Sequence, residues 1–381
     1  FVGSAPVVGH SVRFDLSFLQ RYNILLDNDV IDTYELAAVL LPTASRYNLS
    51  ALSQRLGIIQ TNAHRALEDA RASYAVFLRL YEEALNLPID LVAEFVRLSE
   101  PFDWGASWLF SQVLKFQSHQ PVGARHAHDS HHGPLFGGEL QPLAPPLDPV
   151  EFPQPLDPEE LVALLDYAGP FAKYFESYEH RPQQIEMLRA VTNALSESQH
   201  LMVEAGTGTG KSFAYLVPAA IWAHQNQLRV VISTNTINLQ DQLIKKDIPD
   251  MRAALGIDLR ATVLKGRSNY LCPRRLDHLR QRGPENADEM RVLAKVLVWL
   301  QQGGAGDRNE INLNGPIERE KWLRMSAEDE GCKAEVCISR TGGTCPFYRA
   351  RQSAQSAHLV IINHALLLAD VATGNRVLPD Y

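Results

Sequence analysis

Apolar residues divide the first zone of the chain into short runs and amphipathic stretches. Residues 6–10 form an apolar run that predicts a strand leading into a helix, and residues 30–41 repeat this strand-to-helix order. A long amphipathic helix is expected over residues 62–85, where apolar side chains recur at helical spacing: Leu67, Ala70, Tyr74, Phe77, Leu78 and Tyr81. These patterns predict an α/β segment over residues 1–85.

The second zone, residues 86–156, changes character along its length. Helical material to about residue 117 gives way to a stretch crowded with Pro, Gly and His, which is typical of an exposed linker. Its histidines could in principle collect a metal, but no scaffold for a site accompanies them, so we interpret the stretch as a linker. They are His119, His126, His128, His131 and His132.

The third zone, residues 157–381, alternates strand and helix patterns. Strands are expected at 200–206, 229–236 and near 358–363, and helices at 213–224, 237–251 and after the last strand. Alternation of this kind predicts a parallel, doubly wound sheet. The fold class expected for the whole chain is therefore α/β.

Length and composition set limits on this picture. The 381 residues allow two or three domains, and 45% hydrophobic with 21% charged residues is an ordinary globular balance. The sequence has neither an apolar run long enough to span a membrane nor a signal-peptide pattern, so we expect a cytoplasmic location. Because it begins Phe-Val-Gly without methionine, we expect an internal segment of a longer protein.

Charge is unevenly distributed. A net charge of −8 argues against a general nucleic-acid binder. Residues 245–282, however, hold ten Lys and Arg against four Asp, and such a local excess can bind phosphates whatever the total charge. A solvated helix face is the alternative interpretation.

Residues 205–212 read AGTGTGKS and follow a predicted strand. In a P-loop, backbone N–H groups wrap the phosphates at a helix N-terminus, a lysine neutralises them and the next hydroxyl holds magnesium. Lys211 and Ser212 fit these two roles, and an ordinary glycine-rich turn would not need the lysine. The expected nucleotide-binding residues are Ala205, Gly206, Thr207, Gly208, Thr209, Gly210, Lys211 and Ser212, with Ala205 where the usual pattern has glycine.

Upstream of this loop, Arg181, Gln184 and Met187 have the spacing of segments that read adenine. A glutamine amide can both donate to and accept from the adenine N6/N7 edge. A polar helix start explains the same residues equally well, and their position shortly before Lys211 favours the adenine interpretation.

Four cysteines occur late in the chain: Cys272, Cys332, Cys337 and Cys345. Disulfides are not expected without a secretion signal, whereas four thiolates can hold a zinc ion or an iron–sulfur cluster. A lone cysteine followed by three clustered ones suits an iron–sulfur cluster better than zinc knuckles. Zinc and unligated thiols remain alternatives.

The glycine loop, "STNTINLQDQL", "LKGRSNYLC", the clustered cysteines and "HLVIINHALLL" stand in the order of the DinG/XPD family of superfamily-2 DNA helicases, which residues 170–381 resemble. The resemblance implies a RecA-like P-loop motor domain over 157–381, a [4Fe–4S] insertion at about 265–350 held by the four cysteines, and 5′–3′ movement on single-stranded DNA. It also implies ATP and Mg²⁺ at Lys211 and Ser212, and DNA-backbone contacts near Thr234 and Gln240. The family's DEAH box is not found, so we expect the chain alone to bind nucleotide weakly and not to unwind DNA.

Residues of the first zone carry a second possible chemistry. Two-metal exonucleases need several carboxylates around the ions and a general base. Asp15 follows the first strand in a G-H-x3-F-D pattern, and His64 with Asp69 forms H-x4-D at the long helix. Taken singly, each could be a helix-start histidine or a solvated carboxylate, and Asp32 is expected to be structural.

Together these residues resemble motifs two and three of the DEDDh exonucleases, the group of the polymerase III proofreading subunit. The resemblance implies the C-terminal part of an RNase H-like exonuclease domain over 1–85, with Asp15 and Asp69 binding Mg²⁺ and His64 as the base. Its Asp-x-Glu motif is not found, so we expect no exonuclease activity from this chain alone.

The sequence thus predicts part of an ATP-dependent DNA helicase and 3′–5′ exonuclease of DNA repair, acting on single-stranded and forked DNA. A nucleic-acid-binding protein with structural zinc and an inactive nuclease-like docking domain is the alternative. An ATP-dependent switch acting on RNA is a third possibility.

Overall fold

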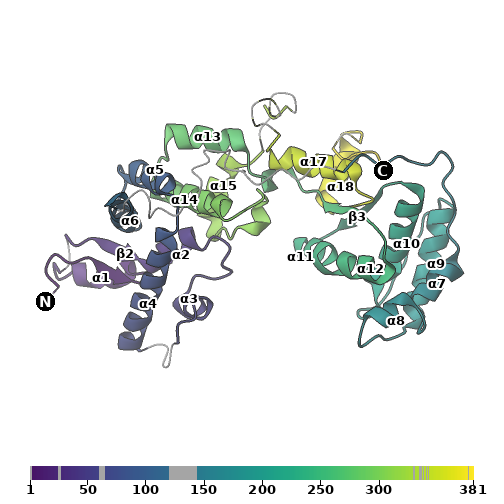
Figure 1. The fold of residues 1–381 in the computed structure, drawn as a ribbon, viewed down its shortest axis with the longest axis horizontal. Helices are drawn as coiled ribbons and strands as arrows, with labels where there is room; N and C mark the ends of the chain where they lie inside the picture. The colour runs from purple at the N-terminus through teal and green to yellow at the C-terminus, as the bar shows by residue number, and fades with distance from the viewer. Residues whose placement is uncertain are drawn as a thin grey trace. The chain divides into compact units, whose positions relative to one another are not determined.

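The computed structural model describes residues 2–24, 27–59, 65–119, 144–328, 331–333, 337, 339, 341, 343–375 and 377–381. The chain divides into two compact units that interleave in sequence. Unit 1 combines Phe1–Leu140 with Arg267–Pro346, and unit 2 combines Gln141–Gly266 with Phe347–Tyr381. Each is described by itself, and Figure 1 labels their elements.

Unit 1 begins with two strand–helix repeats, as the hydrophobic pattern predicts. Strands β1 (Val7–Gly9) and β2 (Val30–Asp32) pair in parallel, with Val7 opposite Val30. The helices of its N-terminal part are α1 (Arg13–Gln20), α2 (Thr33–Leu40), α3 (Leu49–Arg55), α4 (Ala66–Leu85), α5 (Ile89–Ser99) and α6 (Ser107–His119). The predicted strands and the long amphipathic helix are therefore confirmed.

The second part of unit 1 is helical. Its elements are η2 (Arg267–Asn269), α13 (Pro273–Arg282), α14 (Ala287–Gln301), η3 (Arg308–Glu310) and α15 (Gly315–Met325). Helix α14 is buried on nearly every face, from Glu289 to Leu300. A helix that is apolar all round must be covered by neighbours on all sides, and α2, α5 and α15 supply them.

One hydrophobic core joins the two parts of unit 1. Leu36, Val39 and Leu40 of α2 belong to the same buried cluster as Leu293, Val296 and Leu297 of α14. Burial of apolar area is the main favourable term in folding. The N-terminal segment and the cysteine-bearing insertion are therefore stabilised together rather than as two separate cores.

Polar contacts fix the register between these parts. The Arg291 guanidinium pairs with Glu35 at 2.9 Å, and Arg280 pairs with Glu94 at 2.6 Å. The Asn312 side-chain amide donates to the carbonyl oxygen of Ala44 at 2.6 Å. Each contact joins residues more than 180 positions apart in the chain.

Unit 2 contains a three-stranded parallel sheet in the order β3 (Val230–Thr234), β5 (Leu359–Asn363), β4 (Ala261–Val263). Its helices are α7 (Pro158–Leu164), α8 (Pro170–Tyr174), α9 (Pro182–Ser196), α10 (Lys211–Asn226), α11 (Ile237–Gln242), η1 (Leu243–Asp247), α12 (Ile248–Leu255), α17 (Pro346–Ser356) and α18 (His364–Ala372).

Both faces of this sheet are covered. Leu359 and Ile361 of β5 belong to the core beneath α9, α10 and α12, whereas Val360 and Ile362 belong to a separate core on the other face. Alternate residues of a strand point to opposite faces, so a buried run on both faces is the mark of a parallel sheet with helices on each side. The predicted doubly wound arrangement is confirmed for this sheet.

The strand expected at residues 200–206 is wrong for this structure. Among the described residues, this segment lies outside every strand. Met202 is 98% exposed, and Leu201 and Val203 are about half exposed. This segment therefore adds no strand to the sheet of β3, β5 and β4.

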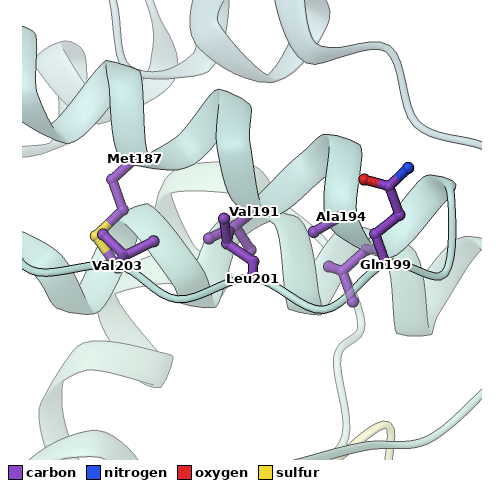
Figure 2. Close-up of a pocket in the computed structure, with 7 residues that line it drawn as sticks. Met187, Val191, Ala194, Gln199, Leu201 and Val203 are labelled. Carbon is purple, nitrogen blue, oxygen red and sulfur yellow. The ribbon is translucent and has the colours of Figure 1, made fainter.

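An apolar hollow of about 320 Å³ lies between this segment and α9. Figure 2 shows Met187 and Val191 of α9 facing Leu201 and Val203 across it. The segment therefore faces α9 through its side chains and not through backbone pairing.

The expected linker lies partly outside the described residues. Residues 86–117 are helical, as predicted, and form α5 and α6 within unit 1. His119 ends α6 and its Nδ1 lies 2.6 Å from the carbonyl oxygen of Lys115, while His126, His128, His131 and His132 fall outside the described part. The predicted boundaries at residues 85 and 156 follow composition, whereas the compact units follow packing.

Candidate nucleotide site and metal-binding residues

The glycine loop folds as a tight turn directly before α10. Gly208 and Gly210 have φ of +80° and +78°, values that glycine adopts without a steric penalty. Gly210 is the N-cap of α10, so Lys211 and Ser212 are the first residues of that helix. The loop therefore presents the N-terminal N–H groups of a helix, where anions are stabilised.

The Lys211 ammonium lies over the loop. Its Nζ donates to the carbonyl oxygens of Ala205 at 2.8 Å and Gly206 at 3.1 Å, while Thr209 Oγ1 donates to Gly206 at 3.0 Å. Lys211, Gly206, Thr207 and Gly208 are exposed. The structure thus brings a positive charge and helix-terminal N–H groups together on an open surface, which is the chemistry of a phosphate site.

Asp247, at the end of η1, is a buried acid that the sequence patterns did not single out. Its carboxylate accepts from the Gln242 side-chain amide at 3.0 Å. Burial raises the pKa of Asp247, and the side chains of Gln242 and Ser212 oppose that rise.

The proposed adenine-reading residues do not converge on one surface. Gln184 is 6% exposed, and its Nε2 donates to the carbonyl oxygen of Gly210 at 2.8 Å. Arg181 pairs with Glu179 at 2.7 Å, and Met187 lines the hollow of Figure 2. In this structure Gln184 is hydrogen-bonded to the glycine loop. Its role in adenine recognition stays a prediction.

All four cysteines are buried and reduced. Cys272, Cys332, Cys337 and Cys345 are 5%, 9%, 4% and 3% exposed, and none forms a disulfide. Burial raises the pKa of the Cys337 thiol, and the nearby thiols of Cys332 and Cys272 raise it further. Cys337 therefore lies within electrostatic reach of two other thiols.

These cysteines are not arranged in the geometry of a metal site. Within the described ranges, no group of three or more His, Cys, Asp or Glu side chains is arranged to hold a metal ion. The donor chemistry nevertheless fits a metal, because buried thiols are the ligands that zinc and iron–sulfur clusters use.

The expected nuclease residues are placed only in part. Asp15 lies exposed in the first turn of α1, and Asp69 lies half-buried in the first turn of α4, a helix that packs against β1. His64 falls outside the described residues. Asp32 caps α2, where its Oδ1 accepts from the N–H groups of Ser11 at 2.8 Å and Tyr34 at 2.9 Å, so its role is structural as expected.

The expected DNA-contact residues of unit 2 are buried. Thr234 is 3% exposed and Gln240 is 2% exposed. The surface of this segment is made instead by residues 235–238, which are all exposed. Thr234 and Gln240 therefore do not present their side chains at the surface in this structure, and the DNA contacts of this segment stay a prediction.

Sequence reasoning missed a buried charge network in unit 1. Lys295 is fully buried and its Nζ lies 2.8 Å from Glu318, which also lies 3.3 Å from Arg291. Burial lowers the pKa of Lys295, and Glu318 opposes this. The signal available in the sequence was a lysine in the middle of an apolar helix, "RVLAKVLVWL". A lysine buried there needs an acidic partner to offset the cost of burying its charge.

Comparison with protein families defines the class of the chain. Residues 1–77 match the Exonuclease family, and residues 181–279 match the DEAD/DEAH box helicase family. The first match contains Asp15 and Asp69, and the second contains the glycine loop with Lys211 and Ser212. The chain therefore resembles exonucleases over residues 1–77 and DEAD/DEAH box helicases over residues 181–279.

Individual relatives span both segments. The chain is 30% identical over 400 residues to a 3′-5′ exonuclease DinG of Bacillus subtilis (strain 168), covering 99% of this chain and 40% of the relative. Proteins of the same name from Staphylococcus saprophyticus and Staphylococcus aureus (strain USA300) are 28% and 27% identical over 95% of this chain. The recognised resemblance, a DinG-type helicase with an N-terminal exonuclease domain, is confirmed.

The chain spans about two-fifths of the length of these curated relatives. Within the described residues, no helix is both long and apolar enough to cross a membrane.

Proposed function

We propose that the chain is the nuclease and nucleotide-binding part of an ATP-dependent DNA helicase and 3′–5′ exonuclease. The observation that carries the proposal is the glycine loop. A lysine enclosed by loop carbonyls opens a helix in a parallel α/β unit. The relatives named 3′-5′ exonuclease DinG support the nuclease half.

ATP with Mg²⁺ is the ligand proposed for unit 2. Lys211 would neutralise the β- and γ-phosphates, the N–H groups of the loop would bind their oxygens, and Ser212 would offer its hydroxyl to the magnesium ion. Hydrolysis in such enzymes needs further acidic groups that position metal and water. The residues described here bind and orient the nucleotide.

The four cysteines of unit 1 would hold a [4Fe–4S] cluster. Bound there, the cluster would link Cys272 to the segment of the three later cysteines and so brace the insertion. Structural zinc in a nucleic-acid-binding protein remains the second candidate, because buried thiols alone do not choose between the metals. Iron and sulfide analysis with a visible charge-transfer band supports the cluster, whereas one equivalent of zinc in a colourless protein supports the alternative.

DNA is the proposed partner, in single-stranded and forked forms, with 5′–3′ unwinding and a role in repair. Competition between DNA and RNA strands of equal length separates this from action on RNA. Asp15, His64 and Asp69 would contribute metal ligands and the base at the nuclease site, in the order that the family resemblance implies.

The experiment that tests the proposal compares activities of the full-length protein on a forked duplex labelled at one 3′ end. Lys211→Ala is expected to stop ATP-dependent strand separation while metal-dependent 3′ shortening continues, and Asp69→Asn is expected to do the reverse. Unwinding that survives Lys211→Ala would contradict the assignment of the loop, and shortening that survives Asp69→Asn would contradict that of the nuclease.

A further inference from the structure

A serine and a histidine from two neighbouring strands meet at one edge of the sheet of unit 2. Ser233 lies near the end of β3, and His364 directly follows β5 as the first residue of α18. Ser233 Oγ lies 2.6 Å from His364 Nδ1, although the two residues are 131 positions apart in the chain. This pair has no part in the nucleotide loop at residues 205–212.

The parallel pairing of β3 and β5 brings these two residues together. Ser233 lies opposite Ile362, and Thr234 lies opposite Asn363, so both strands end at the same edge of the sheet. Parallel α/β sheets usually bind their ligands at the carboxyl ends of the strands, where the following helices begin. His364 is exposed and Ser233 is half-buried. The pair can therefore be reached by a ligand from solvent.

The serine determines which ring nitrogen of His364 is free to donate. A neutral imidazole has one N–H and one acceptor nitrogen, and the contact made by one nitrogen sets the role of the other. Within the described part of the chain, the Ser233 hydroxyl has no acceptor besides His364 Nδ1, so we assign its proton to that contact. The ring proton then lies on Nε2, which has no partner among the described residues. The pair thus offers an oriented N–H donor.

The sequence around this donor is polar or apolar but uncharged. Residues 233–238 read STNTIN and residues 363–368 read NHALLL, without Lys, Arg, Asp or Glu. Residues 235–238 are exposed and include two asparagine amides that can donate. The N-terminal N–H groups of α18 lie at the same edge, and the Asn363 side chain accepts only that of Leu366, at 2.9 Å. Such a set of neutral donors fits an acceptor oxygen of low charge.

A phosphodiester is the acceptor that fits these donors. Each phosphate of a nucleic-acid backbone carries one negative charge and is commonly bound by hydroxyl, amide and helix N-terminal groups. The phosphates of ATP carry more charge, which Lys211 and magnesium would neutralise at the proposed nucleotide site. We propose that His364 Nε2 donates to a phosphodiester oxygen of single-stranded DNA, and that Ser233 is the positioning residue that orients the ring. This inference rests on the proposed action of the protein on DNA.

Two substitutions of His364 separate a DNA contact from a purely structural bond between β3 and α18. His364→Gln places an amide N–H near the position of Nε2 but loses the contact with Ser233. His364→Asn keeps a polar group near the position of Nδ1, and so the contact with Ser233, but has no atom at the position of Nε2. DNA binding should therefore survive in His364→Gln and weaken in His364→Asn. A purely structural role predicts the reverse order.

The measurement is the concentration of single-stranded DNA that half-saturates the ATP turnover of the full-length protein. We expect this concentration to rise about three- to tenfold in His364→Asn, the effect of one lost hydrogen bond, while the affinity for ATP stays unchanged. The rise should be equal for oligo(dT) and for a strand of mixed sequence, because phosphate contacts carry no sequence information. His200→Asn, at an exposed histidine outside every helix and strand of unit 2, is the matched control.

Ser233→Ala provides a second route if a variant of His364 folds poorly. It keeps the ring but removes the group that orients it, so a smaller rise than in His364→Asn is expected. Equal half-saturation in the wild type and His364→Asn, or weaker DNA binding by His364→Gln than by His364→Asn, overturns the role of His364. A rise that depends on base sequence overturns the phosphodiester as the ligand. A wild-type protein whose ATP turnover does not respond to single-stranded DNA would instead overturn the proposed function itself.

Discussion

The glycine loop of unit 2 and the cysteine-bearing core of unit 1 are built in opposite ways. The loop is contiguous: Lys211 contacts carbonyls five and six residues away. The unit 1 core joins residues 31–113 with residues 271–325, and its ion pairs cross more than 180 positions. A short motif therefore specifies the glycine loop, whereas the unit 1 core forms only when distant segments of the chain pack together.

This difference teaches where stability and function are linked. The cysteine-bearing insertion shares a core with the nuclease segment. A substitution that destabilises one part of unit 1 should therefore lower the stability of the whole unit. The loop of unit 2 should respond to local changes alone. The predictions that follow set these two behaviours against each other.

The largest effect is expected from the buried charge network. Lys295→Ala removes the closer of the two cations that pair with buried Glu318 and leaves Arg291 at 3.3 Å. Breaking a buried ion pair costs about 3–5 kcal/mol. Thermal unfolding should show unit 1 melting at a lower temperature, with loss of protease resistance in residues 1–119 as well as 267–328. The control is Arg79→Ala, an exposed pair with Glu82, which should cost less than about 1 kcal/mol.

If only the insertion became sensitive to protease while α2 and α4 stayed protected, the shared core would not be the cooperative unit inferred here.

A smaller effect is expected at the loop itself. Gly210→Ala would place an alanine at a positive φ of +78°. The added Cβ would also lie too close to the side-chain amide of Gln184. Positive φ costs a non-glycine residue about 1–3 kcal/mol. Gly208→Ala is the matched control, since its φ is +80° but no atom lies within 4 Å of the added Cβ.

Stability and nucleotide affinity of the two glycine variants should therefore differ by the Gln184 contact alone. Equal losses in both would show that Gln184 does not support the loop.

The last effect concerns pH. Burial, with smaller contributions from the positive charges of Arg260 and His224, lowers the pKa of His358 to about 4. His358 Nδ1 accepts the N–H of Arg260 at 3.0 Å, which requires the unprotonated nitrogen. Since the folded pKa lies below the unfolded value of 6.5, the unfolded chain takes up the proton first. The stability of unit 2 should fall as pH drops from 6.5 toward 4.

The expected change is about 1–3 kcal/mol across that window. Urea unfolding at pH 7 and pH 4.5, followed by the fluorescence of a variant that keeps Trp222 in α10 as its one tryptophan, measures it. His358→Gln keeps an acceptor but cannot take up a proton, so it should flatten the dependence. An equal slope in this variant would place the titrating group elsewhere.

Local features were predictable because their causes are local. The apolar runs at β3 and β5, the helix after the loop and the positive-φ glycines all follow from a few adjacent residues. The strand expected at 200–206 failed because an apolar run does not show whether a partner strand lies beside it in the fold. Asp247 was not singled out because its burial depends on how η1 packs in the fold, which no short motif specifies.

The joint core of unit 1 was equally beyond a motif-based analysis. Composition marks a boundary near residue 85, but Phe95 and Phe110 of α5 and α6 pack in the same cluster as α14. Apolar spacing shows that a helix has a buried face, yet it does not identify the segment that covers it.

The most direct test of the central claim is equilibrium binding of ATP with magnesium to the wild-type chain, Lys211→Ala and Lys245→Ala. Lys245 is an exposed lysine of the same unit and pairs with Asp241, so its loss should leave binding unchanged. We predict saturable binding that disappears in Lys211→Ala alone. Equal binding by Lys211→Ala and the wild type would contradict the assignment of residues 205–212 as the nucleotide site.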